Sequence, residues 1–216
     1  LVQMTTSAYE GKLRVEYNSL LEKGTEIEAC SQSLRYFFTK MVYLQNRNTL
    51  KTEKWQPWPY LLDLLDIFLT YPEIIIWKAR QLGLSWLVDG YCLWKALFNN
   101  NAKILFFSQG KDEAIELINK ARFIHTHLPS YMQLGEKGHQ GRMYFSFNNS
   151  VVEAKPSTEN AGRGTDTSIV IRDELFYHPY GEANFSAVGP TLDSGGQSID
   201  ISTLESDDLK NHFRER

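Results

Sequence analysis

Hydrophobic positions recur at helical spacing through the first part of the chain. Between residues 8 and 50 they form two stripes, which are Leu13, Tyr17, Leu20 and Leu21, followed by Leu34, Phe37, Phe38, Met41 and Leu44. This spacing places apolar side chains on one helix face, and Gly24-Thr25 is expected to separate the two helices. A polar, proline-containing connector at residues 51–59 leads to a third predicted helix, residues 60–69, which Pro72 stops.

After Pro72 the pattern changes to short apolar runs separated by longer helical segments. Strands are predicted at residues 73–77, 102–107, 142–147, 150–154, 168–171 and 197–202, and helices at 85–98 and 111–128. The β-branched run at 73–77 is typical of a strand buried on both faces. The alternation predicts an α/β fold with a mainly parallel sheet and helices on both faces. We expect a helical N-terminal lead-in over residues 1–54 and the α/β core over residues 55–216.

Bulk composition narrows the class of protein without deciding it. Of the 216 residues, 42% are hydrophobic, 13% aromatic and 23% charged, which suits one folded α/β core. The net charge of -3 is not that of a basic duplex-binding module, so any contact with DNA is expected to be local or transient. Cys30 and Cys92 lack a metal-like spacing and are expected to be buried thiols in a reducing compartment. The sequence contains neither an apolar stretch of bilayer length nor a signal-peptide pattern, so no membrane association is expected.

A loop suited to phosphate follows the strand at 73–77. It runs Lys78-Ala79-Arg80-Gln81-Leu82-Gly83-Leu84-Ser85 into a predicted helix. Such a strand–turn–helix junction directs backbone N–H groups and the positive helix end at one point, which favours an anion. Gly83 lets the backbone approach a ligand closely, and the Ser85 hydroxyl is placed to bind Mg²⁺. The expected nucleotide-binding segment is Gln81, Leu82, Gly83, Leu84, Ser85 and Trp86.

This loop departs from the common pattern G-x-x-x-x-G-K-[ST] at two points. Lys78 or Ala79 occupies the position of the first glycine, and Leu84 occupies that of the lysine. Because leucine cannot neutralise phosphate charge, Lys78 or Arg80 is expected to supply the cation. Taken alone, the loop would be interpreted more simply as a turn whose two basic residues are solvated.

Two carboxylates end a later apolar strand. The run at residues 168–172 is followed directly by Asp173-Glu174. Adjacent strand residues point to opposite faces, but a twisted strand end allows Asp173 to reach a metal ion while Glu174 faces a water. In ATP hydrolysis Asp173 would hold Mg²⁺ and Glu174 would polarise the attacking water. The alternative is a strand end with two solvated acids, and the phosphate-loop candidate upstream favours the catalytic interpretation.

Together these motifs resemble the ATPase domain of phage large terminase subunits, which is an ASCE-type P-loop NTPase. The resemblance runs from about Trp55 to Thr203. The segment Arg80-Gln81-Leu82-Gly83-x-Ser85 is similar to the terminase loop R-Q-x-G-[K]-[ST], and some terminases carry the lysine at the front of the loop, where Lys78 stands. The segments 102–114, Gly162-Arg163-Gly164 and Ile199–Thr203 are similar to further family elements in the same order. After the last of them the family usually continues with proline, where this chain has Leu204.

The resemblance implies roles for further residues. Gln56 would contact adenine, and Arg163 would act on the ATP of a neighbouring subunit as an arginine finger. Ser202 and Thr203 would sense the γ-phosphate and couple its loss to movement. The implied catalytic set is Glu174, Arg163, Lys78 and Arg80, and the implied metal ligands are Ser85 and Asp173.

The same resemblance implies a function. ATP and Mg²⁺ would be the cofactors, and ATP hydrolysis would power translocation of viral double-stranded DNA into a procapsid in the host-cell cytoplasm. The expected assembly is a homo-oligomeric ring on a portal, with a small terminase subunit as a further candidate partner. The nuclease domain of the whole protein would be absent from this chain. The alternatives are a helicase-like or remodelling ATPase of the same class, and a nucleotide-binding scaffold domain without turnover.

Overall fold

The computed structural model describes residues 6–46, 49–133, 135–162 and 167–203. Its helices are α1 (Thr6–Gln32), α2 (Leu34–Lys40), α3 (Pro59–Thr70), α4 (Leu84–Phe98), α5 (Lys111–Thr126) and α6 (Gly181–Asp193), with a short 3-10 helix, η1 (Leu175–Tyr177). Its strands are β1 (Tyr43–Gln45), β2 (Thr52–Lys54), β3 (Glu73–Lys78), β4 (Lys103–Ser108), β5 (Glu136–His139), β6 (Arg142–Phe145), β7 (Ser150–Pro156), β8 (Ile169–Asp173) and β9 (Gln197–Thr203).

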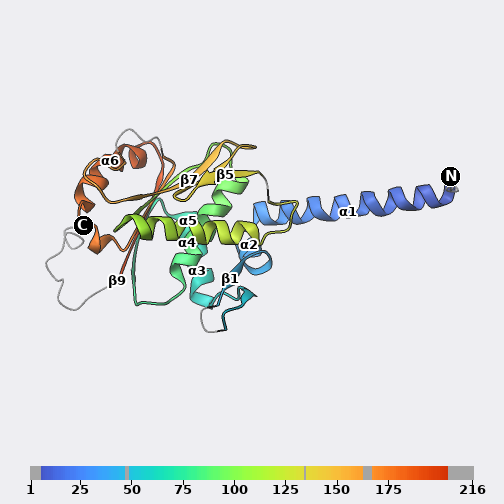
Figure 1. Cartoon of the computed structure of the whole chain (residues 1–216), viewed down its shortest axis with the longest axis horizontal. Coiled ribbons are helices and arrows are strands. Elements are labelled where there is room, and N and C mark those ends of the chain that lie inside the picture. Colours follow the sequence, from blue (N-terminus) through green and yellow to red (C-terminus); the bar gives the residue numbers. More distant parts are fainter. Residues whose placement is uncertain (1–5, 47–48, 134, 163–166, 204–216) are drawn as a thin grey trace.

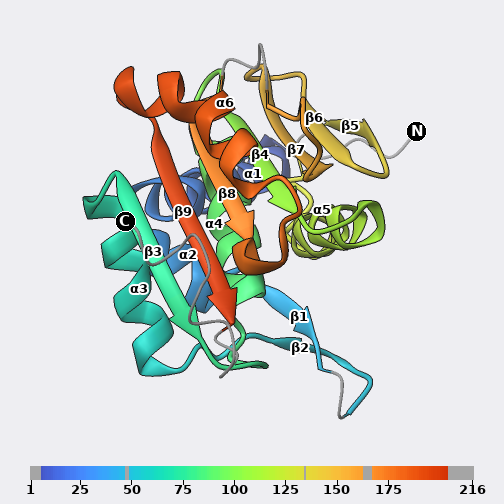
Figure 2. The ribbon, with the colours of Figure 1, turned by 90° about the vertical axis from the view of Figure 1, so that its left-hand side faces the viewer.

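Seven strands form one sheet in the order β3-β9-β8-β4-β7-β6-β5. The strands from β3 to β7 pair in parallel, and the hairpin of β5 and β6 continues the sheet antiparallel. The mainly parallel sheet predicted from the sequence is therefore confirmed. Since β3, β9 and β8 run side by side in one direction, their carboxyl ends meet at one edge of the sheet (Figure 2).

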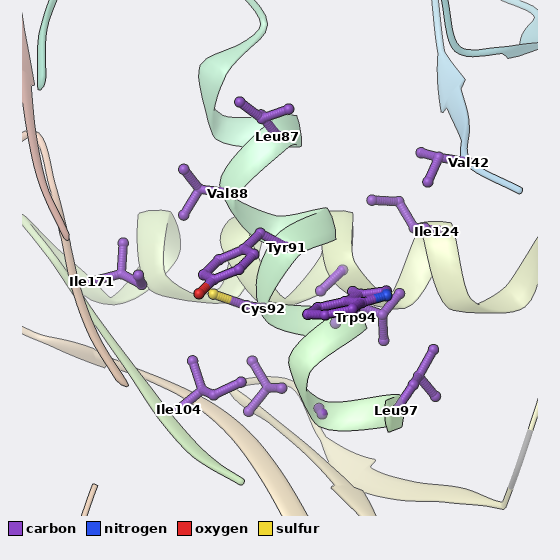
Figure 3. Close-up of a cluster of buried hydrophobic side chains, with 14 of the residues drawn as sticks. Val42, Leu87, Val88, Tyr91, Cys92, Trp94, Leu97, Ile104, Ile124 and Ile171 are labelled. Carbon is purple, nitrogen blue, oxygen red and sulfur yellow. The ribbon is translucent and has the colours of Figure 1, made fainter. Parts of the chain in front are cut away.

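Alternating side chains divide each central strand between two cores. Ile104 and Phe106 belong to the main core, which α2, α3, α4 and α5 cover. Leu105 and Phe107 point the other way, into a smaller core that α6 closes with Val188. Figure 3 shows how α4 supplies much of the main core. The predicted helices on both faces are thus confirmed, because a strand with two apolar faces needs cover on each.

The N-terminal region differs from its prediction in two ways. Helix α1 runs through Gly24 without a break and extends away from the rest of the molecule (Figure 1). An exposed glycine costs a helix only about 1 kcal/mol, and the interruption comes instead at Ser33, whose side chain caps α2 by accepting a hydrogen bond from the Tyr36 N–H. Residues 43–45 and 52–54 form the antiparallel hairpin of β1 and β2, not a helix and a connector.

Strand β3 was expected to be buried on both faces, and this was wrong. In the described part of the chain β3 pairs with β9 alone, so it lies at the sheet edge. Ile74 is buried, whereas Ile75 and Trp77 are 46% and 40% exposed. An apolar run does not by itself distinguish a central strand from an edge strand. Strand β5 and helix α6 had no counterpart in the predicted elements.

Other expectations concern single features of the chain. Cys30 and Cys92 are free and buried, as expected. None of the described helices combines the length and apolar character needed to cross a bilayer. The boundary between residues 54 and 55 stays a prediction, although Val42 and Trp55 pack in the same core as α4.

Gly90 allows α2 and α4 to approach closely. A Cβ atom at Gly90 would lie 2.7 Å from Cζ of the buried Phe38. Alanine improves helix propensity by about 1 kcal/mol over glycine, but overpacking a core costs about 1–3 kcal/mol. We therefore expect Gly90→Ala to lower the free energy of unfolding in urea, and Phe38→Leu to recover part of the loss. A more stable Gly90→Ala protein would contradict this packing.

Candidate functional site

The β3–α4 loop lies at the carboxyl edge of the parallel strands. Strand β3 ends at Lys78, and α4 begins after Gly83, which has a φ of 74°. This left-handed conformation favours glycine. The Tyr60 hydroxyl of α3 donates a hydrogen bond of 2.9 Å to the Leu82 carbonyl and so ties the loop to α3. The sequence thus folds here as the strand–turn–helix junction that was predicted.

A hollow of about 410 Å³ opens against this loop. It is lined by Lys78, the run from Gln81 to Trp86, and Lys120 of α5. Backbone N–H groups at the start of α4 have no partner in the helix itself, so this end of the hollow favours an anion. The hollow contains every residue of the predicted nucleotide-binding segment.

The structure separates the two candidate cations of the loop. Leu84, at the position of the usual lysine, is 3% exposed and packs into the main core. Lys78 lines the hollow, whereas Arg80 is exposed and lies outside its lining. Of the two candidate cations, Lys78 is therefore the one that a ligand in this hollow would meet.

Lys78 is joined to Glu174 by an ion pair of 2.5 Å. The carboxylate of Glu174 also accepts hydrogen bonds of 2.9 Å from the Thr203 N–H and from the Thr203 hydroxyl. Burial would raise the pKa of Glu174, but the hydrogen bonds from Lys78 and Thr203 outweigh it, so the pKa lies below its usual value. Glu174 is therefore an ionised carboxylate at neutral pH.

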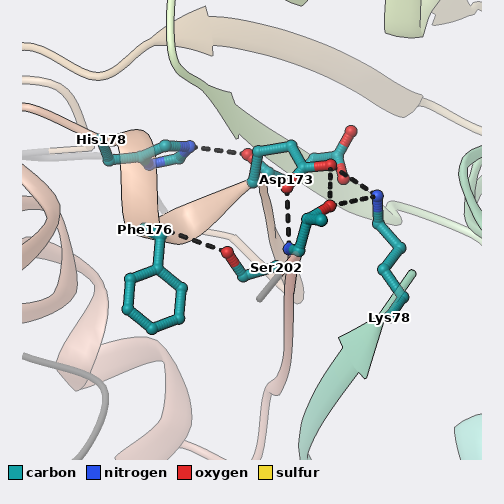
Figure 4. Close-up of polar contacts among 7 residues, drawn as sticks. Lys78, Asp173, Phe176, His178 and Ser202 are labelled. Carbon is teal, nitrogen blue, oxygen red and sulfur yellow. Dashed lines mark hydrogen bonds and ion pairs between the residues drawn. The ribbon is translucent and has the colours of Figure 1, made fainter. Parts of the chain in front are cut away.

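Asp173 ends β8 beside this cluster. Figure 4 shows it between Lys78 and His178, whose Nε2–H donates a hydrogen bond of 2.7 Å to the Asp173 carbonyl. Burial raises the pKa of the Asp173 carboxyl, and Lys78 opposes that effect. Its Oδ1 atom is buried and has no hydrogen-bond partner among the described residues. Burial also lowers the pKa of His178 to about 4, so its ring is neutral.

The two predicted coupling residues lie in different surroundings at the end of β9. Thr203 contacts both Glu174 and Lys78, the latter at 3.4 Å. Ser202 is fully buried, and its hydroxyl accepts a hydrogen bond of 3.2 Å from the Phe176 N–H of η1 (Figure 4). Thr203 is thus linked to the hollow through Lys78, while Ser202 connects β9 to η1.

A second hollow of about 710 Å³ adjoins the first. Gln81, Gly83 and Trp86 line both, and the second is closed by the β1–β2 hairpin and by residues 55–61. Gln56, for which contact with adenine was predicted, lies in its wall. The pair of hollows offers one smaller, polar space and one larger space with aromatic residues in its walls.

The residues around the loop fit Mg²⁺. This ion prefers oxygen ligands and keeps several waters and phosphate oxygens. Ser85 lines the hollow, and the unpartnered Oδ1 of Asp173, at the end of β8, is an oxygen of the kind that this ion binds. The described residues contain no group of three or more His, Cys, Asp or Glu side chains suited to a metal ion. A metal held here would therefore depend on the nucleotide.

The sequence matches no family model and no curated protein. Solved structures do match. The large terminase of bacteriophage HK97 aligns with a TM-score of 0.65 and 17% identity, over 82% of this chain and 38% of that one. The ATPase domain of the Thermus phage P74-26 large terminase aligns with a TM-score of 0.52 and 17% identity, over 70% of this chain and 71% of that domain. This chain has the fold of phage large terminase ATPase domains.

A third structure carries the same terminase fold. A large terminase from a thermophilic bacteriophage aligns with a TM-score of 0.55 and 12% identity, over 68% of this chain and 39% of that one. The chain thus spans about two fifths of the length of this terminase and of the HK97 terminase. At identities this low, the structural likeness shows a shared fold.

Three further residues bear on the site, one predicted from the sequence and two that were not. Arg163, the predicted arginine finger, lies outside the described residues. Lys120 and Asp89 were not foreseen, since each sits within a helix and carries no motif. Their proximity to the site arises because α4 and α5 pack together, with Trp86 against Phe123 at 5.7 Å.

Asp89 lies one helical turn after Ser85 and is fully buried. Neither of its carboxylate oxygens has a hydrogen-bond partner among the described residues. Burial raises its pKa well above the usual value; Lys120 acts against this shift, and Asp173 adds to it. The folded state therefore binds the Asp89 proton more tightly than the unfolded state does.

This tight proton binding gives a pH-dependent prediction. Stability falls with rising pH wherever the folded state holds more protons, which begins here near the ordinary Asp pKa of about 4. Asp89→Asn removes that titration. The melting temperature of the variant minus that of the unchanged protein should therefore become more positive from pH 4 to pH 8. Differential scanning fluorimetry measures this, with exposed Asp112→Asn as control. A difference that stays constant with pH would refute it.

Proposed function

We propose that this chain hydrolyses ATP with Mg²⁺ and is the motor domain of a phage large terminase. The observation that carries the proposal is the cluster of Lys78, Glu174 and Thr203 at the carboxyl edge of the sheet, beside the polar hollow against the β3–α4 loop. Open α/β sheets bind ligands at this edge. The terminase fold supports the proposal independently of these contacts.

Each part of the site has a separate task in this reaction. The backbone N–H groups from Gln81 to Ser85 would hold the phosphates, and Gln56 would contact the adenine in the second hollow. Ser85 and Asp173 would hold Mg²⁺, which neutralises charge on the phosphates. Glu174 would orient and polarise the attacking water.

The Lys78–Glu174 ion pair suggests how the site is kept inactive without nucleotide. Glu174 accepts hydrogen bonds from Lys78 and Thr203, so both carboxylate oxygens are occupied. A phosphate that drew Lys78 away would free one acceptor position on Oε1 of Glu174 for water, while the Thr203 hydroxyl would keep its hydrogen bond to the same oxygen. Thr203 belongs to the same hydrogen-bond network, so loss of the γ-phosphate would change its contacts at the end of β9.

The wider role follows from the same proposal. The motor would move double-stranded DNA into a procapsid in the host-cell cytoplasm, as a homo-oligomeric ring on a portal, with a small terminase subunit as a candidate partner. The overall charge of -3 fits transient contact with DNA better than tight binding. Arg163 would stabilise the transition state in the neighbouring subunit, a contribution of about 10³- to 10⁵-fold in rate.

A nucleotide-binding scaffold without turnover is the second candidate. Leu84 at the lysine position favours it, because the loop lacks its usual charge. An ionised Glu174 placed beside the hollow argues against it, since binding alone needs no such group. A helicase-like or remodelling ATPase would share the chemistry and differ in its partner.

The proposal is tested by steady-state ATP hydrolysis with Mg²⁺ over a wide range of protein concentration. Activity should rise more than linearly with concentration and be lost in both Glu174→Ala and Arg163→Ala, while Lys137→Ala on β5 keeps it. Linear activity lost in Glu174→Ala alone would retain the ATPase and discard the arginine finger. Binding of ATP without turnover at any concentration would favour the scaffold.

A further inference from the structure

Lys120 reaches the polar hollow against the β3–α4 loop from a different element than the loop. It lies on α5, and its side chain, 16% exposed, lines the hollow with Lys78 and the residues from Gln81 to Trp86. The packing of Trp86 against Phe123, one turn further along α5, fixes this face of the helix toward α4. A lysine is seldom this buried without a charged partner.

The contacts of Lys120 within the protein do not use the full hydrogen-bonding capacity of its ammonium group. Its Nζ atom lies 3.4 Å from Oε1 of Glu116, which is longer than a good hydrogen bond. Glu116 is itself half exposed, so this pair contributes little. Burial raises the pKa of both Asp89 and Asp173, and the nearby positive charge of Lys120 opposes this rise. An ammonium has three N–H donors, and these contacts leave capacity for a further anion.

The loop, in turn, carries less positive charge than usual where phosphate would bind, because Lys78 is the one loop cation in the lining of the hollow. Leu84 occupies the lysine position and faces the core. Lys78 is held by Glu174 at 2.5 Å. We propose that Lys120 contacts the phosphate chain of the bound nucleotide and supplies the charge that position 84 lacks. This inference rests on the proposed function, because it assumes that a nucleoside polyphosphate occupies the hollow.

A structural role for Lys120 is the competing explanation. On that view the ammonium only interacts with the buried carboxyl groups of Asp89 and Asp173, and its loss would lower stability alone. A phosphate-binding role predicts instead that replacing Lys120 lowers ligand affinity, and that this loss grows with the number of phosphates on the ligand. Affinities for AMP, ADP and ATP therefore separate the two.

The test is calorimetric titration of the full chain with Mg-ATP, Mg-ADP and AMP. Lys120→Met should weaken ATP binding about 10- to 100-fold, ADP binding less and AMP binding little, as expected for loss of a charged hydrogen bond. Lys120→Arg should retain most of the affinity. Lys137→Met on β5 makes the same change in net charge far from the hollow and should bind as the unchanged protein does.

Different outcomes overturn different claims. Equal ATP affinity in Lys120→Met and Lys137→Met would overturn the role of Lys120 and leave the proposed function standing. No ATP binding by the unchanged protein would overturn the proposed function itself. If Lys120→Met does not fold, Glu116→Gln carries the test, since a released ammonium should tighten ATP binding about 2- to 5-fold without tightening AMP binding. Unchanged ATP affinity in Glu116→Gln would count against the proposal.

Discussion

Replacing Glu174 with glutamine is expected to reduce ATP turnover by about 10²- to 10⁴-fold, the usual contribution of a general base. The amide keeps the size of the side chain, but it cannot take up a proton or polarise water as a carboxylate does. The Lys78 ion pair would also be lost, which frees Lys78 for phosphate. ATP binding should therefore be retained or tightened while hydrolysis is lost.

This prediction is measured by phosphate release together with calorimetric ATP binding. Glu73→Gln is the matched control, because Glu73 is exposed and lies at the amino end of β3, whereas the site lies at the carboxyl end. Its turnover should equal that of the unchanged protein. A Glu174→Gln protein that hydrolyses ATP at an unchanged rate would show that another group activates the water.

A second large effect is expected from the buried ion pair between β8 and β9. Arg172 donates to Asp200 at 2.5 and 3.0 Å and to the Ser198 hydroxyl at 2.8 Å, and both charged residues are buried. Its guanidinium also stacks over the Phe185 ring of α6. Arg172→Met would leave a buried carboxylate without its cation, which costs about 3–5 kcal/mol. For a chain of this size, the melting temperature should fall by about 6–20 °C.

The control for this prediction removes both charges. Arg172→Met combined with Asp200→Leu should regain most of the lost stability, since a well-packed apolar pair often replaces a buried ion pair without loss. Urea unfolding compares the single and double variants. A single variant that loses less than about 1 kcal/mol would mean that water or another group reaches Asp200. The pair matters for the site because the same two strands carry Asp173 and Thr203 to its edge.

The sequence predicted those parts of the site that depend on local pattern. An apolar run followed directly by Asp173 and Glu174 predicts a strand with two acidic residues at its carboxyl end. Gly83 before a helical segment likewise predicts a turn into a helix, since glycine favours the left-handed conformation found there. Parallel strands then bring these segments to one edge, whatever their distance along the chain.

Features that depend on tertiary contact were not predictable. Nothing in the run at 73–78 reveals that its strand lies at an edge, because burial depends on which strands flank it. Lys120 follows no motif, and its place in the hollow depends on how α5 packs against α4. Spacing alone likewise could not show that Lys78 lines the hollow and Arg80 does not, because that depends on how the folded loop lies.

The central claim is that Mg-ATP binds in the hollow against the β3–α4 loop. A crystal structure with a non-hydrolysable ATP analogue and Mn²⁺ tests it most directly, because anomalous scattering locates the metal. We predict phosphates along residues 81–85, the metal between Ser85 and Asp173, and Lys78 moved from Glu174 toward phosphate. Nucleotide bound elsewhere, or a Lys78–Glu174 ion pair unchanged beside bound nucleotide, would contradict the account.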